Sequence, residues 1–320
     1  MSVVERLDRF QRSHPRASVP VAVVYKFADD QGNYLAALIT YYGFLSLFPL
    51  LLLSSTILSF VLHGNPDLQR SLLDSALGQF PIVGTQLADP QGLSGNGVGL
   101  AVGILGTVYG GLGVAQAAQN AMNTIWRVPR NSRPNPLQSR LRSLLLLLVV
   151  GLSLIGTTAL AALGSVFNGF GIGTKIALGI GTFALNAVVF TIAFRVATAR
   201  DITLRQTVPG AVAAALTWQL LQYFGALYVG HVVKGATAIN SVFALVLGLI
   251  AWIYLEAVIV VLAVEYNSVR SLGLYPRALL TPFTDDVDLT DADERSYTQQ
   301  AEATRAKGFE EINVDFDPPD

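Results

Sequence analysis

The chain of 320 residues is 52% hydrophobic and only 13% charged, with a mean hydropathy of +0.49. A soluble globular domain carries about 25% charged residues, so this composition argues against a water-soluble protein and favours an integral membrane protein. The net charge of −1 hides an asymmetry, because residues 271–320 hold 4 Lys/Arg against 12 Asp/Glu while the preceding part is basic.

The N-terminal segment, residues 1–33, is arginine-rich and lacks the apolar core of a signal peptide. Within it, Val3–Phe10 shows a weakly amphipathic, basic pattern. Anionic lipids attract arginine at the cytoplasmic membrane surface. We therefore expect a cytoplasmic amphipathic segment here, and we expect the first spanning helix to drive insertion.

Six stretches are long and apolar enough to cross the bilayer, since a spanning helix needs about 20 mainly apolar residues. They are Tyr34–Leu62, Val98–Asn120, Leu144–Phe167, Ile172–Ala197, Val208–Gly230 and Asn240–Asn267. The sequence thus predicts an all-α integral membrane bundle of six transmembrane helices over residues 34–270. In the second stretch, Gly99, Gly103, Gly106, Gly110 and Gly113 recur every three or four residues, a spacing typical of close helix packing in membranes.

Two further segments lie outside these spans. Pro66–Phe80 places Leu68, Leu72, Ala76, Leu77 and Phe80 on one face, which predicts an amphipathic helix in the first external loop. Residues 271–320 are acidic and poor in large apolar residues after Tyr275. We expect this cytoplasmic tail to be disordered, because it has little to bury.

The basic residues predict the orientation. Residues 1–33 carry five Lys/Arg and residues 121–143 another five, whereas residues 63–97 carry only Arg70. The alternation continues along the chain. The third and fifth connections offer only one basic residue each, Lys175 and Lys234, whereas the fourth connection and the C-terminal segment are richer; they hold Arg195, Arg200 and Arg205, and Arg270 and Arg277. Short cytoplasmic loops retain positive charge, so both termini are predicted to be cytoplasmic.

Polar side chains at bilayer depth are the candidate functional residues. Those near the middle of the predicted spans, or beside the proline of the first span, are Glu256, Gln219, Asn186, Tyr41, Tyr42, Ser46 and Pro49. One interpretation is a polar cavity through which a substrate passes. The other is that the amides and hydroxyls hold helices together, at about 1 kcal/mol for each bond. Both interpretations remain open for Glu256, which should face the bundle and meet a polar neighbour such as Gln219, Gln222 or Tyr42.

Arg195 and Glu265 are predicted at similar depths near the cytoplasmic face. We expect an ion pair or helix cap there, with contact to a lipid headgroup as the alternative.

The sequence offers little for enzyme chemistry. There is no cysteine, the three histidines show no metal-binding spacing, and no Gly-x-Ser-x-Gly nucleophile elbow is present. We expect no enzymatic activity, no cofactor, no metal and no nucleic-acid partner. Membrane lipids are the expected partners, and the acidic tail could recruit a protein.

Four stretches resemble the YihY/BrkB family of bacterial inner-membrane proteins, in the right order and over residues 20–270. They are Leu35–Pro49 (LAALITYYGFLSLFP), Asn120–Trp126 (NAMNTIW), Arg205–Ala211 (RQTVPGA), and Trp252–Leu255 (WIYL) followed by Val264–Asn267 (VEYN). The sequence departs from the family pattern at Glu256, where a small polar residue is frequent, and at Ala263, which replaces a glycine.

The resemblance implies a six-helix protein of the bacterial plasma membrane, connected in some members with serum resistance or lipid export. The family was once labelled ribonuclease BN, which this sequence gives no reason to adopt. The expected function is transport or handling of an envelope lipid or amphiphile. The alternative is a non-transporting scaffold for envelope assembly.

Overall fold

A computed structural model describes residues 3–61, 97–166, 172–232, 238–284 and 286–316. All regular elements in these ranges are helices, which confirms the predicted all-α class. They are α1 (Val3–Ser13), α2 (Pro15–Asp29), α3 (Gly32–Val61), α5 (Gly97–Ile125), the short 3-10 helix η2 (Arg130–Ser132), α6 (Pro136–Val166), α7 (Ile172–Ala197), α8 (Leu204–Val232), α9 (Ala238–Leu272) and α10 (Asp291–Glu302).

Six of these helices form the body of the molecule, and each predicted span lies within one of them or overlaps it. Several begin earlier or end later than the apolar stretch; α6 starts at Pro136 rather than near Leu144. Hydropathy identifies only the part of a helix that prefers lipid, so it does not detect the helical turns that continue into the polar region. Over the described residues, three segments satisfy both the length and the hydropathy of a membrane span: Pro136–Leu160, Ile172–Ala197 and Val246–Leu272. The amphipathic helix predicted at Pro66–Phe80 lies outside the described residues.

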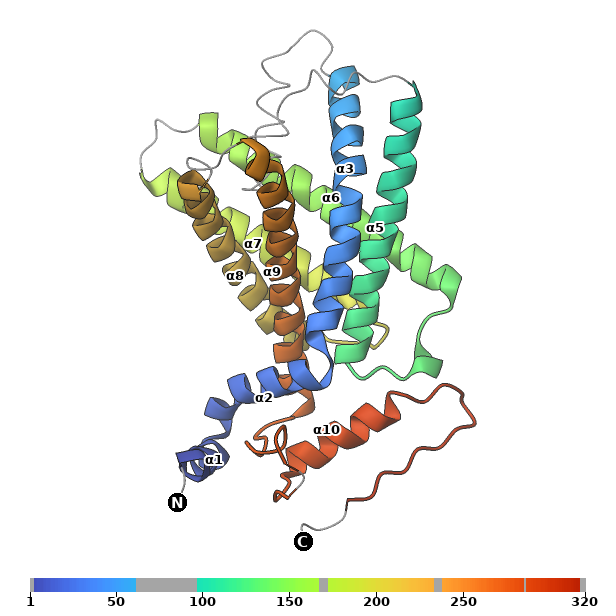
Figure 1. Cartoon of the computed structure of the whole chain (residues 1–320), viewed down its shortest axis with the longest axis vertical. Helices are drawn as coiled ribbons and strands as arrows, with labels where there is room; N and C mark the ends of the chain where they lie inside the picture. The colour runs from blue at the N-terminus through green and yellow to red at the C-terminus, as the bar shows by residue number, and fades with distance from the viewer. Residues whose placement is uncertain (1–2, 62–96, 167–171, 233–237, 285, 317–320) are drawn as a thin grey trace.

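The six long helices pack in a ring. Each packs chiefly against two other long helices, in the cyclic order α3, α5, α6, α7, α8, α9. Each long helix packs against the next one along the chain, and the ring closes where α9, the last, returns to lie against α3, the first (Figure 1). In addition, α5 contacts α7 and α9 across the ring.

Small residues allow the helices of the ring to approach closely. A β-carbon on Gly110 of α5 would lie 2.7 Å from Cα of Ser46 in α3, and one on Gly113 would overlap the ring of Tyr42. The glycine spacing noted in the sequence therefore brings α5 against α3 at these two positions.

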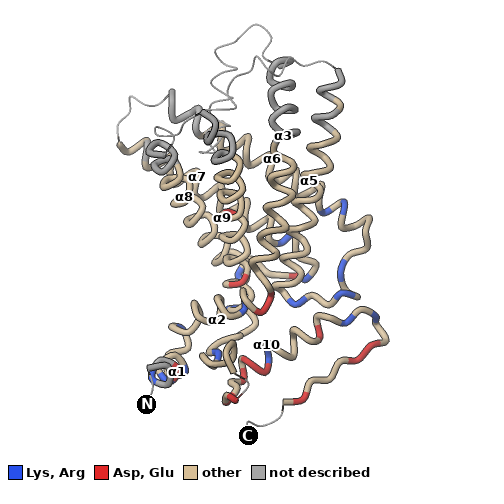
Figure 2. The backbone as a smooth tube through the Cα atoms, viewed as in Figure 1, with Lys and Arg blue, Asp and Glu red and all other residues tan. Residues whose placement is uncertain are grey.

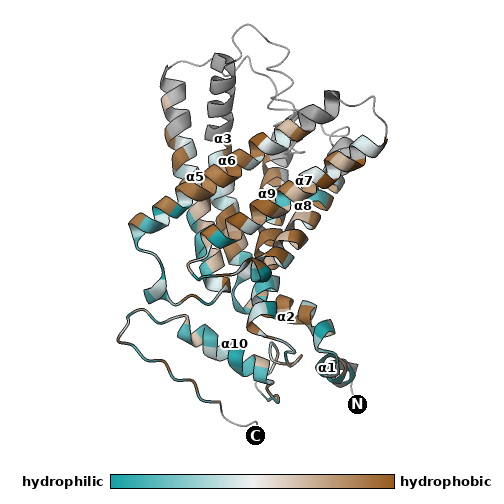
Figure 3. Ribbon diagram, turned by 180° about the vertical axis from the view of Figure 1, so that it is seen from behind, coloured by the Kyte–Doolittle hydropathy of each residue, from teal (hydrophilic) through white to brown (hydrophobic). Residues whose placement is uncertain are grey.

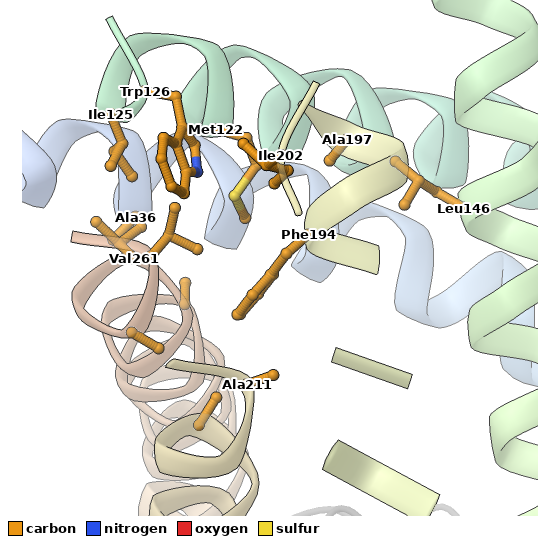
Figure 4. Packing of buried hydrophobic residues seen from close by; sticks show 14 of the residues in the cluster. Ala36, Met122, Ile125, Trp126, Leu146, Phe194, Ala197, Ile202, Ala211 and Val261 are labelled. Carbon is orange, nitrogen blue, oxygen red and sulfur yellow. The ribbon is translucent and has the colours of Figure 1, made fainter. Parts of the chain in front are cut away.

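The hydrophobic core, whose packing is drawn in Figure 4, gathers buried side chains where the start of α3 meets the ends of other long helices. It joins the start of α3, the ends of α5 and α7 and the last half of α9 through Ala36, Ile125, Trp126, Phe194 and Val261. The outer faces remain apolar and exposed; examples are Leu148, Leu152 and Ile155 of α6 and Ile180 of α7. Figure 3 shows this apolar coat on the bundle and the hydrophilic character of α10.

Charged residues gather at the same end of the molecule as the termini (Figure 2). There α2 and α10 run across the ends of the long helices rather than along them (Figure 1). The N-terminal segment forms α1 and also α2, a second helix that the sequence pattern did not predict.

The expected disorder of the acidic tail is wrong for residues 271–284 and 286–316. The helix α10 begins with a capping box, in which the Thr290 side chain accepts from the Asp293 backbone and the Asp293 side chain accepts from the Thr290 backbone. The carboxylate of Asp293 also binds Arg277, which contacts Asp29 of α2 at 3.1 Å. Order here comes from paired charges and a cap, which a count of apolar residues does not detect.

Candidate functional site

Glu256 lies close to the middle of α9 with 8% of its surface exposed. Its Oε1 atom accepts a hydrogen bond from Nε1 of Trp252, one turn earlier, at 2.7 Å, and a longer one from Nε2 of Gln222 in α8 at 3.4 Å. The predicted orientation toward the bundle, with a polar neighbour from the fifth long helix, is therefore confirmed. The carboxyl bridges α8 and α9 without a cationic partner among the described residues.

Space for this arrangement comes from Gly225 of α8. A β-carbon there would overlap the indole ring of Trp252. The missing side chain lets Trp252 lie against α8 and aim its N–H at Glu256.

The other predicted polar positions are more dispersed. Gln219 of α8 and Asn186 of α7 are half-buried, and Tyr41 of α3 is 60% exposed. Tyr42 stacks edge-on with Tyr41, and the hydroxyl of Ser46 donates to the carbonyl of Gly43 in its own helix. No hydrogen bond joins any of these described side chains to Glu256. Pro49 lies within α3, but its side chain is outside the described residues.

A second polar cluster, of four charged side chains, lies at the end of the ring nearest the termini. Nζ of Lys26 in α2 donates to Asp30 at 2.5 Å, to Glu265 of α9 at 2.9 Å and to the carbonyl of Ile125 at 2.8 Å. Nη1 of Arg127, just after α5, lies 2.6 Å from Asp30. Two cations thus balance two anions, and the cluster joins α2, α5 and α9 where they meet.

The predicted pairing of Arg195 with Glu265 is wrong. Arg195 is exposed, and its Nε donates to the carbonyl of Ile202 at 3.1 Å, in the connection between α7 and α8. Glu265 instead meets Lys26, because α2 crosses beneath the end of α9. In the sequence, Lys26 follows Ala22 and Val23 at helical spacing, which would place it on the same face as these apolar residues; in the structure all three are buried. A lysine on the buried face of a helix needs a buried acid.

Groups for binding a metal are sparse. Among the described residues, no three His, Asp or Glu side chains come close enough to share an ion. The chemistry available is that of single carboxyls, amides, indoles and guanidinium groups.

The match to a known family is extensive. The family model described as Virulence factor BrkB matches residues 23–278, from α2 to just beyond α9. The chain belongs to this family. The matched residues include the six long helices of the ring, Glu256 and the four-charge cluster.

The chain also resembles part of one individual protein, whose description gives no activity. A protein of Dickeya dadantii (strain 3937), described as uncharacterized, is 41% identical over 63 residues. The match spans 20% of this chain and 19% of that relative. No solved structure matches the chain.

Proposed function

We propose that this BrkB-family membrane protein crosses the bacterial inner membrane six times, with both termini cytoplasmic, and moves or handles an envelope lipid or another amphiphile. The six long helices have 26 to 35 residues. At 1.5 Å per residue, each exceeds the roughly 30 Å hydrocarbon thickness of a bilayer. The apolar coat and the charges gathered at one end support this placement.

Glu256 is the observation that carries the functional part of the proposal. It is buried in an apolar helix, at the seam with α8, and it is held by the neutral donors of Trp252 and Gln222. Amides or hydroxyls suffice to hold two membrane helices together, whereas a carboxyl at this depth is costly and marks a pathway for a substrate or a proton in many membrane proteins.

Substituting Glu256 by glutamine in proteoliposomes tests the proposal. Wild-type protein should accelerate the movement of a fluorescent phospholipid between leaflets, measured by dithionite quenching, and Glu256→Gln should abolish the acceleration while the protein remains folded. Thr217→Val is the matched control on α8, because this exposed hydroxyl bonds only to Ala213 of its own helix.

The scaffold alternative gives the opposite result. If Glu256 only joins α8 to α9, glutamine preserves the hydrogen bond from Trp252 and changes nothing. Equal rates for wild type and variant, or no lipid movement by the wild type, would contradict a transport role for Glu256.

A further inference from the structure

A pocket of about 510 Å³ opens beside the four-charge cluster, at the end of the ring nearest the termini. The end of α2, the start of α3, the last turns of α5 and η2 form its walls, and α10 closes one side. Its cationic lining residues are Arg127, Arg130 and Arg133, and its acids are Asp29 and Asp30. The volume accommodates a phosphorylated headgroup or a small phosphorylated molecule.

Arg127 has more donors than the protein satisfies. Its side chain is 5% exposed, and Nη1 lies against Asp30, but the buried Nε and Nη2 atoms have no hydrogen-bond partner in the described structure. A guanidinium with two unbonded nitrogens is costly to bury. An additional acceptor would satisfy it.

Backbone strain is concentrated at the same place. Gln31 and Arg127 are the non-glycine residues with positive φ among the described residues, at 55° and 53°, and both line this pocket. The left-handed conformation is unfavourable for a residue with a β-carbon. Strain of this kind clusters at ligand sites, where the surrounding structure enforces it.

Arg133 is fixed in place but lacks an acid. It donates to the carbonyl of Val128 at 3.3 Å, to Asn120 at 3.1 Å and to Thr124 at 3.5 Å. Burial and then the nearby charge of Arg130 hold the pKa of Arg133 below its ordinary value. A bound anion would remove this repulsion.

The acids of the pocket do not supply that anion. Asp30 is shared by Lys26 and Arg127, and Asp29 binds Arg277. Arg130 and Arg133 therefore carry about two positive charges that no carboxylate of the described residues neutralises. A phosphate monoester carries a charge of about −1.5 to −2 at neutral pH and accepts bidentate bonds from guanidinium groups.

We infer that this arginine-lined pocket binds a phosphate monoester, with Arg130 and Arg133 neutralising its charge. The inference deepens the proposed function and rests on it, since the pocket adjoins the apolar ring and would hold the polar end of a phospholipid. The same chemistry would bind a free phosphorylated molecule, and the experiment distinguishes the two sources.

Two probes test the inference on the full-length protein. Inorganic phosphate is titrated calorimetrically into protein in detergent, and dioleoylphosphatidic acid is tested by the rise in melting temperature in nanodiscs of dioleoylphosphatidylcholine. Arg130→Gln and Arg133→Gln should each weaken binding about tenfold, the loss expected for a charge-assisted hydrogen bond. Arg205→Gln is the control, because Arg205 is exposed at the start of α8 and outside the pocket.

Each outcome decides the matter. Arginine-dependent binding of inorganic phosphate supports a site for the phosphate group itself, and arginine-dependent stabilisation by phosphatidic acid alone identifies the lipid as its source. Binding of neither probe, equal binding by all variants, or equally tight binding of succinate would overturn the inference. If Arg133→Gln fails to fold, the binding measured for Arg130→Gln still tests the inference, because Arg130 is exposed. Glu256→Gln should retain phosphate binding, so a failure of lipid movement and a failure of this site are distinguishable.

Discussion

Nζ of Lys26 in α2 lies 2.9 Å from Oε2 of Glu265 in α9, and neither side chain is exposed. This contact attaches the N-terminal helix to the last helix of the ring. Lys26 also binds Asp30, which Arg127 neutralises from the other side. The balance of the four charges, more than any single pair, makes the cluster tolerable in a buried place.

Removing one cation should therefore be costly. Lys26→Met leaves Asp30 and Glu265 with Arg127 alone, and we expect a loss of about 3–5 kcal/mol in the free energy of unfolding. The double variant Lys26→Met with Glu265→Gln restores one cation to one anion and should recover most of the loss. Thermal unfolding in detergent measures both, with the exposed Lys307→Met as control. A double variant no more stable than the single one would contradict the explanation by charge balance.

Gly210 should not tolerate a side chain. Its N–H donates to Oδ1 of Asn267 at 2.7 Å, and a β-carbon would overlap the carbonyl oxygen of Ala263. Gly210→Ala should separate α8 from α9 and cost about 1–3 kcal/mol. Gly151→Ala in α6 has nothing within 4 Å of the new methyl group and should be neutral or stabilising by up to about 1 kcal/mol. Melting temperatures that fall equally for both variants would contradict this account.

The docked tail predicts a further loss of stability. Asp293 is buried and accepts from Arg277, from the backbone of Ala278 at 2.9 Å and from Thr290. Burial alone would lower the pKa of Arg277, but Asp29 and Asp293 outweigh it and hold that pKa above its ordinary value. Asp293→Asn should reduce stability by about 3 kcal/mol, whereas the neighbouring exposed Glu294→Gln should have little effect. Limited proteolysis of the tail gives an independent measurement, and equal protection of both variants would show that the ion pair does not hold α10.

Tyr25 gives a pH dependence outside the ring. Its hydroxyl donates to the carbonyl of Leu279 at 2.6 Å, and burial raises its pKa above the ordinary value of 10.0, opposed by the charge of Arg277. The folded state thus favours the neutral phenol. This contribution is fully present below pH 10 and is lost as the pH rises through the folded pKa. The stability difference between wild type and Tyr25→Phe should shrink over that alkaline range, and a difference independent of pH would contradict the assignment.

The long helices were predictable because an apolar stretch is a local property. Trp252 and Glu256 are also one helical turn apart, so their contact follows from sequence spacing. The partner of Glu265 was not predictable in the same way, since Lys26 is 239 residues away and belongs to a helix that hydropathy does not mark. The same holds for Asp293, because the sequence shows an acidic residue but not the buried arginine that it meets. Long-range pairing of charges depends on how the ends of the helices cross.

The orientation of the ring is the last prediction. Alternating Lys/Arg content places both termini and the connection after α5 on the cytoplasmic side, because positive charges in short loops resist translocation. That connection contains Arg127, Arg130 and Arg133. The natural chain has no cysteine, so single cysteines at Gln91 and Asn131 can be labelled without background. An impermeant thiol reagent applied to intact cells should label Gln91→Cys and should reach Asn131→Cys, an exposed position, only after the membrane is opened. Labelling of both from the same side would contradict six crossings with a cytoplasmic N-terminus, and it would also place the arginine-lined pocket and Lys26 on a side of the membrane that the basic residues do not favour.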